Sequence, residues 1–157
     1  MYQKINEEID KKIQTIIEGD YEVSILGTLD KEGYPFLSKI QPMYDNNKIY
    51  ILISDLSEHT QNIISNNKVS FYFSMKENNN TKLNNPRLTL NGSISKLELN
   101  KNSLKYIALL KNYQKIEKGS KMWGMFSDFN FYLFTPYRGL FIEGFGEAYQ
   151  KIYPTDF

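Results

Sequence analysis

The sequence of 157 residues contains no cysteine and only one histidine, His59. The lack of cysteine excludes thiol nucleophiles, disulfides and thiolate metal ligands. With a single histidine, every motif that is built on paired histidines is excluded as well. We therefore expect no intrinsic zinc or iron centre and assign no metal ligand.

An excess of charge of either sign is also lacking, since 19 Lys and Arg residues face 18 Asp and Glu residues and the net charge is +1. Such a chain has no broad field to attract nucleic acid or an anionic membrane, so neither is expected as a partner. The N-terminal segment MYQKINEEIDKKIQTIIEGD lacks the long apolar run of a signal peptide or a membrane span. We expect a cytoplasmic protein.

The apolar periodicity predicts one domain over residues 1–157, with many short strands and few helices. KIYILIS at 48–54 is almost wholly apolar, as in a strand that is buried on both faces. The hairpin spacing favours a mainly β fold, an antiparallel barrel with peripheral helices. The expected elements are an N-terminal helix at 1–19, barrel strands over 21–99 with a helix at 55–65, a helix at 100–119 and closing strands at 129–151.

The segment SDLSEHTQN at 54–62 predicts a helix that starts directly after the buried strand. Free backbone N–H groups at such a helix start can bind a phosphate, and the hydroxyls of Ser54 and Thr60 add donors. Asp55 and Glu58 lie at the same end and oppose an anion. His59 either supports a phosphate there or is a half-buried helix histidine that packs against its neighbours.

Four stretches, taken in order, resemble the FMN-binding split barrel of the pyridoxamine 5'-phosphate oxidase superfamily over residues 21–99. They are GTLDKEGYPFLSKIQPMY, IYILISDLSEHTQNII, NNKVSFYF and RLTLNGSISKLE. The resemblance implies an antiparallel split barrel, a homodimer, and FMN bound between the protomers. Met43 replaces a lysine of the oxidases, and their C-terminal Trp-Arg and Arg-x-x-Pro features are missing. A true pyridoxamine 5'-phosphate oxidase is therefore not expected.

The same resemblance implies where FMN would bind. Ser38 stands in place of a phosphate-contacting arginine, and Ser54 in place of a threonine. His59 and Thr60 replace an Arg-Lys pair, and Arg87 matches the arginine that opens a later strand. Lys39 is a further cation at a strand end. The expected cofactor-binding residues are thus Ser38, Lys39, Ser54, His59, Thr60 and Arg87, and no catalytic side chain is assigned.

The C-terminal segment SDFNFYLFTPYRGLFIEGFGEAYQ is similar to the haem-utilisation branch of this superfamily, through Glu143, Gly144, Phe145, Gly146 and Ala148. This likeness implies haem as a ligand or substrate. The glycines are equally explained by a bend in a strand. That branch ligates iron with a C-terminal histidine and an acidic residue, which Asp128 matches here, but this sequence ends without the histidine. His59, Tyr149 or Tyr153, or a residue outside this chain, would have to take its place.

Three interpretations follow. The chain is a small flavin-dependent oxidoreductase or a haem-utilisation (haem-degrading) protein, with FMN or haem as its planar ligand. Alternatively it is a non-enzymatic carrier of haem or flavin. In the third interpretation it is a cofactor-free member, in which SDLSEHTQN is only a capped helix.

Overall fold

The structure, a computed structural model, describes residues 1–78 and 80–154. In chain order the elements are β1 (Gln3–Lys4), α1 (Glu7–Ile17), β2 (Val23–Leu29), β3 (Pro35–Lys39), β4 (Met43–Asp45), β5 (Lys48–Ser54), α2 (Glu58–Ser65), β6 (Lys68–Ser74), η1 (Lys82–Asn84), β7 (Arg87–Lys96), α3 (Leu104–Ile116), α4 (Ser120–Trp123), β8 (Phe129–Gly144) and β9 (Glu147–Ile152). The chain is thus mainly β with a few helices. None of the described helices has both the length and the apolar character needed to cross a membrane.

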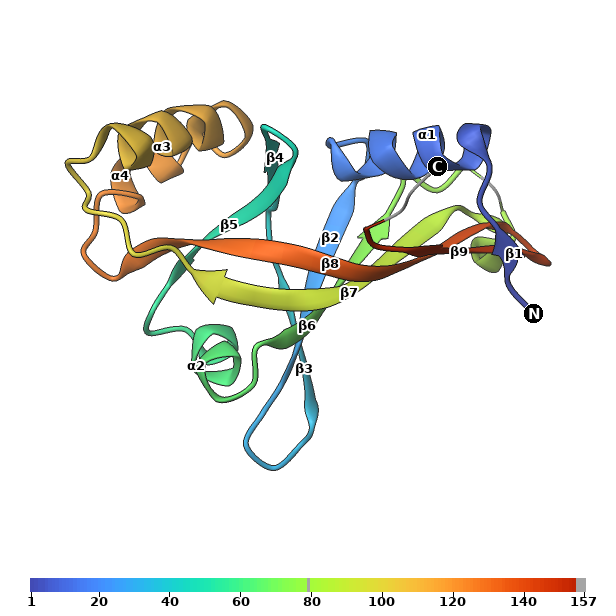
Figure 1. Cartoon of the computed structure of the whole chain (residues 1–157), viewed down its shortest axis with the longest axis horizontal. Helices are drawn as coiled ribbons and strands as arrows, with labels where there is room; N and C mark the ends of the chain where they lie inside the picture. The colour runs from blue at the N-terminus through green and yellow to red at the C-terminus, as the bar shows by residue number, and fades with distance from the viewer. Residues whose placement is uncertain (79, 155–157) are drawn as a thin grey trace.

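The strands form one sheet in the order β1-β9-β8-β7-β6-β2-β3, and β5 branches from β8 and carries β4. The first part of β8 pairs with β5 and its last part with β9, while β7 runs along nearly all of it. Figure 1 shows β7 and β8 crossing the whole molecule, with α1, α3 and α4 on one side and α2 on the other. This open arrangement is consistent with a split barrel.

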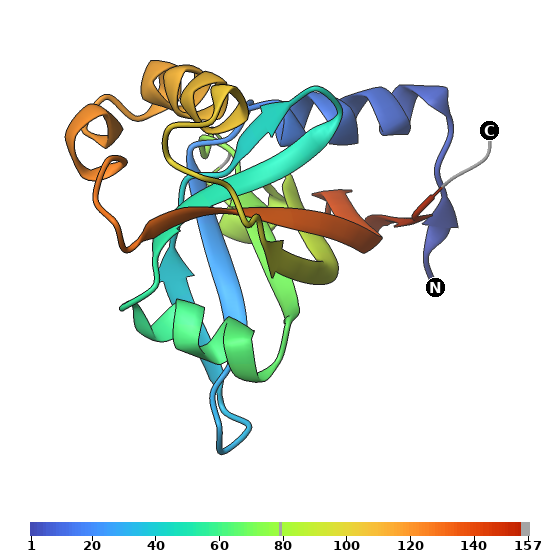
Figure 2. The same cartoon turned by 60° about the vertical axis from the view of Figure 1, so that its left-hand side comes forward.

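The sheet is mixed, because β1 and β9 are parallel, and this corrects the expectation of purely antiparallel pairing. Antiparallel neighbours elsewhere follow from short hairpins, but β1 and β9 lie at opposite ends of the chain and no hairpin sets their direction. Both views show the two strands side by side at one end of the molecule (Figures 1 and 2).

The helices are shorter than the sequence predicted. α1 starts at Glu7 because Asn6 caps it, accepting a hydrogen bond from the Ile9 N–H at 2.9 Å. α2 starts at Glu58, since the residues before it form a turn. α3 starts after Ser103, whose hydroxyl accepts from the Tyr106 N–H. The glycines Gly144 and Gly146 lie where β8 turns into β9. Gly146 has a φ of 80°, and the register of the two strands shifts between Ile142 and Gly144, so the segment is a turn between two strands with an irregularity beside it.

Two apolar cores hold the elements together. One fills the barrel and is closed by α1, whose Ile9, Ile13 and Ile16 are buried. The other lies between α3 and the opposite face of β5 and β8. β5 serves both, since Ile51 faces the barrel and Leu52 faces α3, and the predicted burial of this strand on both faces is confirmed.

Candidate functional site

At the start of α2, the hydroxyls predicted to bind a phosphate are engaged within the protein. Ser54 Oγ donates to Asp128 Oδ2 at 2.5 Å and accepts from the Leu56 N–H at 3.1 Å. Thr60 Oγ1 donates to the Ser54 carbonyl at 2.6 Å. The structure therefore brings Ser54 and Thr60 together, but their hydrogen bonds hold the turn that leads from β5 into α2.

Two carboxylates also lie at this helix start. The Asp55 N–H donates to the Asp128 carbonyl, so the two acidic residues are neighbours. The Asp55 carboxylate accepts from Lys96 Nζ at 3.1 Å, Asn130 Nδ2 at 2.9 Å and Tyr132 Oη at 3.2 Å. Burial raises the pKa of Tyr132, and the nearby Asp55 carboxylate raises it further. Negative charge fixed at a helix N-terminus competes there with any bound anion.

The structure does not bring Arg87 to α2. Asn62 Nδ2 anchors α2 to Thr28 Oγ1 at the end of β2. Arg87 pairs with Ser74, and Ser74 pairs with Val23 at the other end of β2. Five residue steps along a strand correspond to about 16 Å. The Arg87 guanidinium instead donates to the carbonyls of Leu83 and Asn85.

The remaining predicted residues lie on opposite faces of β3. Ser38 pairs with the buried Leu26 and faces the barrel, where its hydroxyl is buried without a partner. Lys39 pairs with Ile25 on the outer face and is exposed. The part of all six residues in binding a cofactor stays a prediction, and the structure gathers only Ser54 and Thr60 through direct hydrogen bonds.

His59 is half-buried on α2, and its Nε2 is buried without a hydrogen bond. Burial lowers the pKa of this imidazole, because desolvation disfavours the charged form. Two other residues considered for iron are also enclosed. Tyr149 stacks on Phe141 with ring centroids 6.4 Å apart, and the Tyr153 hydroxyl is buried without a partner.

The outer face of the sheet carries a site that sequence reasoning missed. Strand register aligns five residues in one row across five strands: Leu37, Gly27, Ser70, Asn91 and Arg138. The row has an exposed leucine at one end and a guanidinium at the other, with small or neutral side chains between them. Because the middle of the row lacks bulk, the surface is hollowed there.

We call this hollow the outer-face groove. Its volume is about 910 Å³, within the usual range for ligand pockets. Besides the row itself, its walls include prolines, hydroxyl side chains and two tyrosines. They are Thr28, Leu29, Pro35, Lys68, Val69, Gly92, Ser93, Thr135, Pro136, Tyr137, Tyr153 and Pro154. The groove is thus largely apolar, with Arg138 at one end and Lys68 among its walls.

Arg138 is the distinctive charge of this groove. Its guanidinium lies over the Tyr2 ring, 5.6 Å from the ring centroid, and its Nε is buried without a hydrogen bond. Within residues 1–78 and 80–154 it has no carboxylate partner. A guanidinium without a carboxylate partner leaves its charge uncompensated, and an anionic group of a ligand would pair with it.

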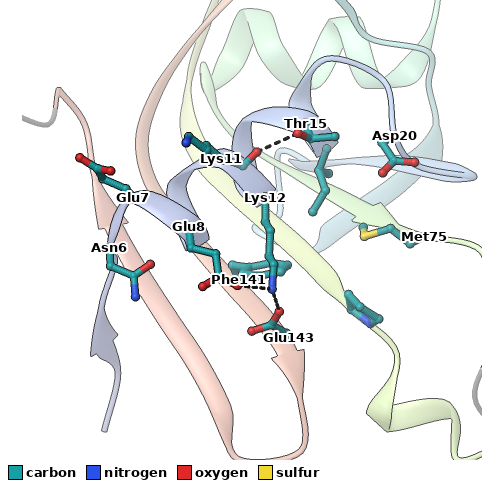
Figure 3. A pocket seen from close by; sticks show the side chains of 12 residues that line it. Asn6, Glu7, Glu8, Lys11, Lys12, Thr15, Asp20, Met75, Phe141 and Glu143 are labelled. Atoms are coloured by element: carbon teal, nitrogen blue, oxygen red, sulfur yellow. Dashed lines mark hydrogen bonds and ion pairs between the residues drawn. The ribbon is translucent and has the colours of Figure 1, made fainter.

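A second groove lies between α1 and the end of β8, and the cation in it is paired with carboxylates (Figure 3). Its volume is also about 910 Å³, and Lys12 projects from α1 toward Glu143. Lys12 forms ion pairs with both Glu8 and Glu143. Its cation is therefore neutralised by the chain itself, whereas Arg138 is not.

Alternation along each strand predicts that Gly27, Ser70 and Asn91 face away from the core. It does not show that they are neighbours, because that depends on the pairing of strands far apart in the sequence. The sequence pattern also does not predict that Arg138 faces outward, because it follows a β-bulge that shifts the alternation of faces in β8.

Comparison with known proteins gives a family model described as CREG, beta-barrel, which matches residues 17–157. The solved structures that are similar include Campylobacter jejuni ChuZ, with a TM-score of 0.82 and 22% identity over 99% of this chain and 68% of that one. A heme binding protein from Mycobacterium smegmatis has a TM-score of 0.76 and 21% identity over 87% of this chain and 55% of that one. This chain therefore spans about half the length of that protein. HutZ, the heme storage protein from Vibrio cholerae, has a TM-score of 0.63 and 20% identity over 85% of this chain and 91% of that one. No curated protein matches the sequence. These structures share the split-barrel-like fold.

Proposed function

The chain belongs to the CREG, beta-barrel family, and on this basis we propose that it binds a planar, anionic cofactor of the haem or flavin kind in the outer-face groove. The observation that carries the proposal is Arg138, a cation at the end of a largely apolar groove that has no carboxylate partner among the described residues. Its guanidinium suits a carboxylate or phosphate, while Leu37 and the prolines suit an apolar ring.

Haem is the ligand we favour. Two proteins that share the fold carry haem in their names, one as a binding protein and one as a storage protein. A porphyrin with two carboxylates matches a groove that has Arg138 at one end and Lys68 among its walls. The protein would then hold haem as cargo or as substrate. If haem is a substrate that the protein degrades, the reaction would use dioxygen and electrons from an external donor.

Flavin is the second candidate, and the polar floor of the groove favours it. Asn91, Ser93 and Thr135 present amide and hydroxyl groups there, and such groups can hydrogen-bond the polar edge of an isoalloxazine ring. FMN would supply the redox chemistry, and the chain would bind and orient it. The protein would then be a small oxidoreductase.

We also propose that a second copy of the chain covers the groove. Large apolar side chains are exposed around it: Tyr34, Leu37 and Tyr137. Exposed aromatic and aliphatic side chains gathered on one face are typical of an interface. A ligand in the groove would then lie between two protomers.

Absorbance titration tests the proposal. The purified protein is titrated separately with haemin and with FMN, and a saturable Soret band or a saturable flavin shift near one ligand per chain is the expected result. Saturation by FMN without haemin would select the oxidoreductase interpretation. A protein that binds neither would be a cofactor-free family member, and the proposal would be wrong.

A further inference from the structure

Haem in the outer-face groove would need a ligand for its iron. Among the residues that the structure describes, those lining the groove include no histidine, cysteine or methionine. Those that can offer an oxygen or nitrogen to iron at the groove surface are Tyr137, Tyr153 and Lys68. His59 lies on α2 and is not part of the groove lining.

Two of these three are poorly suited. The Tyr153 hydroxyl is buried, and its ring packs against the barrel core. Burial raises the pKa of Tyr153, so its phenolate is disfavoured. Lys68 carries a strongly hydrated ammonium at the exposed start of β6 and has no lone pair until it loses a proton. Tyr137 remains.

Tyr137 is the extra residue of the bulge in β8. In the pairing with β7, Gly92 stands opposite Pro136 and Asn91 stands opposite Arg138, which leaves Tyr137 without a cross-strand partner. Its carbonyl accepts from the Tyr153 N–H at 3.0 Å, and this bond fixes the bulge to the chain after β9. Bulges re-aim a side chain and are common beside active sites.

The bulge also depends on close packing. A Cβ on Gly92 would lie 2.2 Å from the Thr135 carbonyl oxygen, so only glycine permits this approach. The side chain that this backbone presents is unusually accessible, since Tyr137 is 64% exposed although it lies in the middle of a long strand. A large aromatic residue held by a rigid bulge, exposed in a groove and next to Arg138, is well placed to meet a ligand.

We propose that Tyr137 is the axial ligand of ferric haem in the outer-face groove, an inference that rests on the proposed haem function. A bond forms between the phenolate oxygen and iron(III), the phenol proton passes to solvent, and a water or chloride leaves the iron. Tyrosine is an established protein ligand of haem iron. Arg138, the next residue, would pair with a carboxylate of the same haem.

The test uses three full-length proteins: the wild type, Tyr137→Phe and Tyr72→Phe. Tyr72 is the matched control, because it lies on the same face of the sheet but does not line the groove. Each protein is titrated with haemin and with metal-free protoporphyrin IX, and the haemin complexes are examined by absorbance and electron paramagnetic resonance. Thermal unfolding confirms that the variants are folded.

We expect Tyr137→Phe to weaken haemin binding at least tenfold and to change the ferric spectrum, while porphyrin binding stays the same. Tyr72→Phe should match the wild type with both ligands. If Tyr137→Phe binds haemin with wild-type affinity and spectrum, the assignment of Tyr137 is wrong, although haem binding itself stands. If the wild type binds no haemin, the proposed haem function fails, and the inference fails with it.

Discussion

Asn91 of β7 pairs directly with Arg138 of β8, so that a neutral amide and a cationic guanidinium stand side by side on the outer face of the sheet. Asn91 Nδ2 donates to Ser70 Oγ at 3.3 Å, whereas the buried Nε of Arg138 has no acceptor. The Asn91 amide thus has a hydrogen-bond partner within the chain, whereas the cation of Arg138 has no carboxylate partner among the described residues. This difference marks Arg138 as the partner of an anion that comes from outside the chain.

Replacing Arg138 by Gln should weaken binding of the anionic cofactor by about 1.4 to 3 kcal/mol, which is roughly ten- to a hundredfold, since one charge-assisted hydrogen bond is lost. Titration of haemin, followed by absorbance, measures the change. Lys31→Gln is the control, because Lys31 is an exposed cation in the turn between β2 and β3 and does not line the groove. An equal loss in both variants would mean that only general charge attraction is at work.

Leu37→Arg should weaken the proposed dimer by about 2 kcal/mol or more, because Leu37 is 69% exposed beside the groove and would lose its burial against the second copy. Light scattering over a dilution series measures the dissociation. The control is Leu56→Arg, since Leu56 is also highly exposed but lies before α2. A wild type that is monomeric throughout the series would refute the dimer.

Gly92→Ala should destabilise the fold by about 1 to 3 kcal/mol, because its Cβ would overlap the Thr135 carbonyl and the Phe134 ring. Urea denaturation measures the free energy of unfolding. Gly27→Ala serves as the control, since a Cβ there meets its nearest neighbours at 3.5 to 3.8 Å and should leave the stability nearly unchanged. Equal stability of both variants would show that β7 and β8 are not so closely packed at the bulge.

The stability should fall as the pH drops below about 6.5, the ordinary pKa of histidine. Burial lowers the pKa of His59 in the folded state, so the unfolded chain takes up a proton first and unfolding becomes easier. Above that pH both states hold a neutral imidazole, and His59 adds no pH dependence. The measurement is the melting temperature between pH 5 and 8 for the wild type and for His59→Gln, which keeps a side chain of similar length.

His59 is the only histidine, so its contribution can be isolated by this variant. His59→Gln should lose less stability than the wild type toward pH 5. If instead the variant keeps the wild-type pH dependence but binds FMN more weakly, His59 belongs to a phosphate site and its packing is secondary.

The sequence predicted much of the local structure. The apolar periodicity predicted the helix that forms α1, and the apolar run at 48–54 predicted a strand that is buried on both faces. Local patterns suffice there, since the period of apolar residues reflects which face of one element is buried. The helix starts were predicted too early, because they depend on caps such as Asn6.

The site was harder to predict. Ser54 donates to Asp128, 74 residues away, and no local pattern shows that this hydroxyl is already engaged. The outer-face groove exists only because four separate strand pairings bring five residues into register: Leu37, Gly27, Ser70, Asn91 and Arg138. A single sequence carries no direct record of such pairing, and the bulge at Tyr137 further obscures the alternation of β8.

The central claim is that the planar ligand lies in the outer-face groove, and filling the groove tests it most directly. Ser70→Trp places a large ring on the groove floor, while Ser74→Trp places one on the same face of the same strand, outside the groove. The measurement is the haemin affinity of the two variants and the wild type, with circular dichroism to confirm their folding. We predict that the wild type and Ser74→Trp bind haemin alike and that Ser70→Trp binds at least tenfold more weakly. Equal haemin binding by all three proteins would contradict the claim and move the ligand elsewhere.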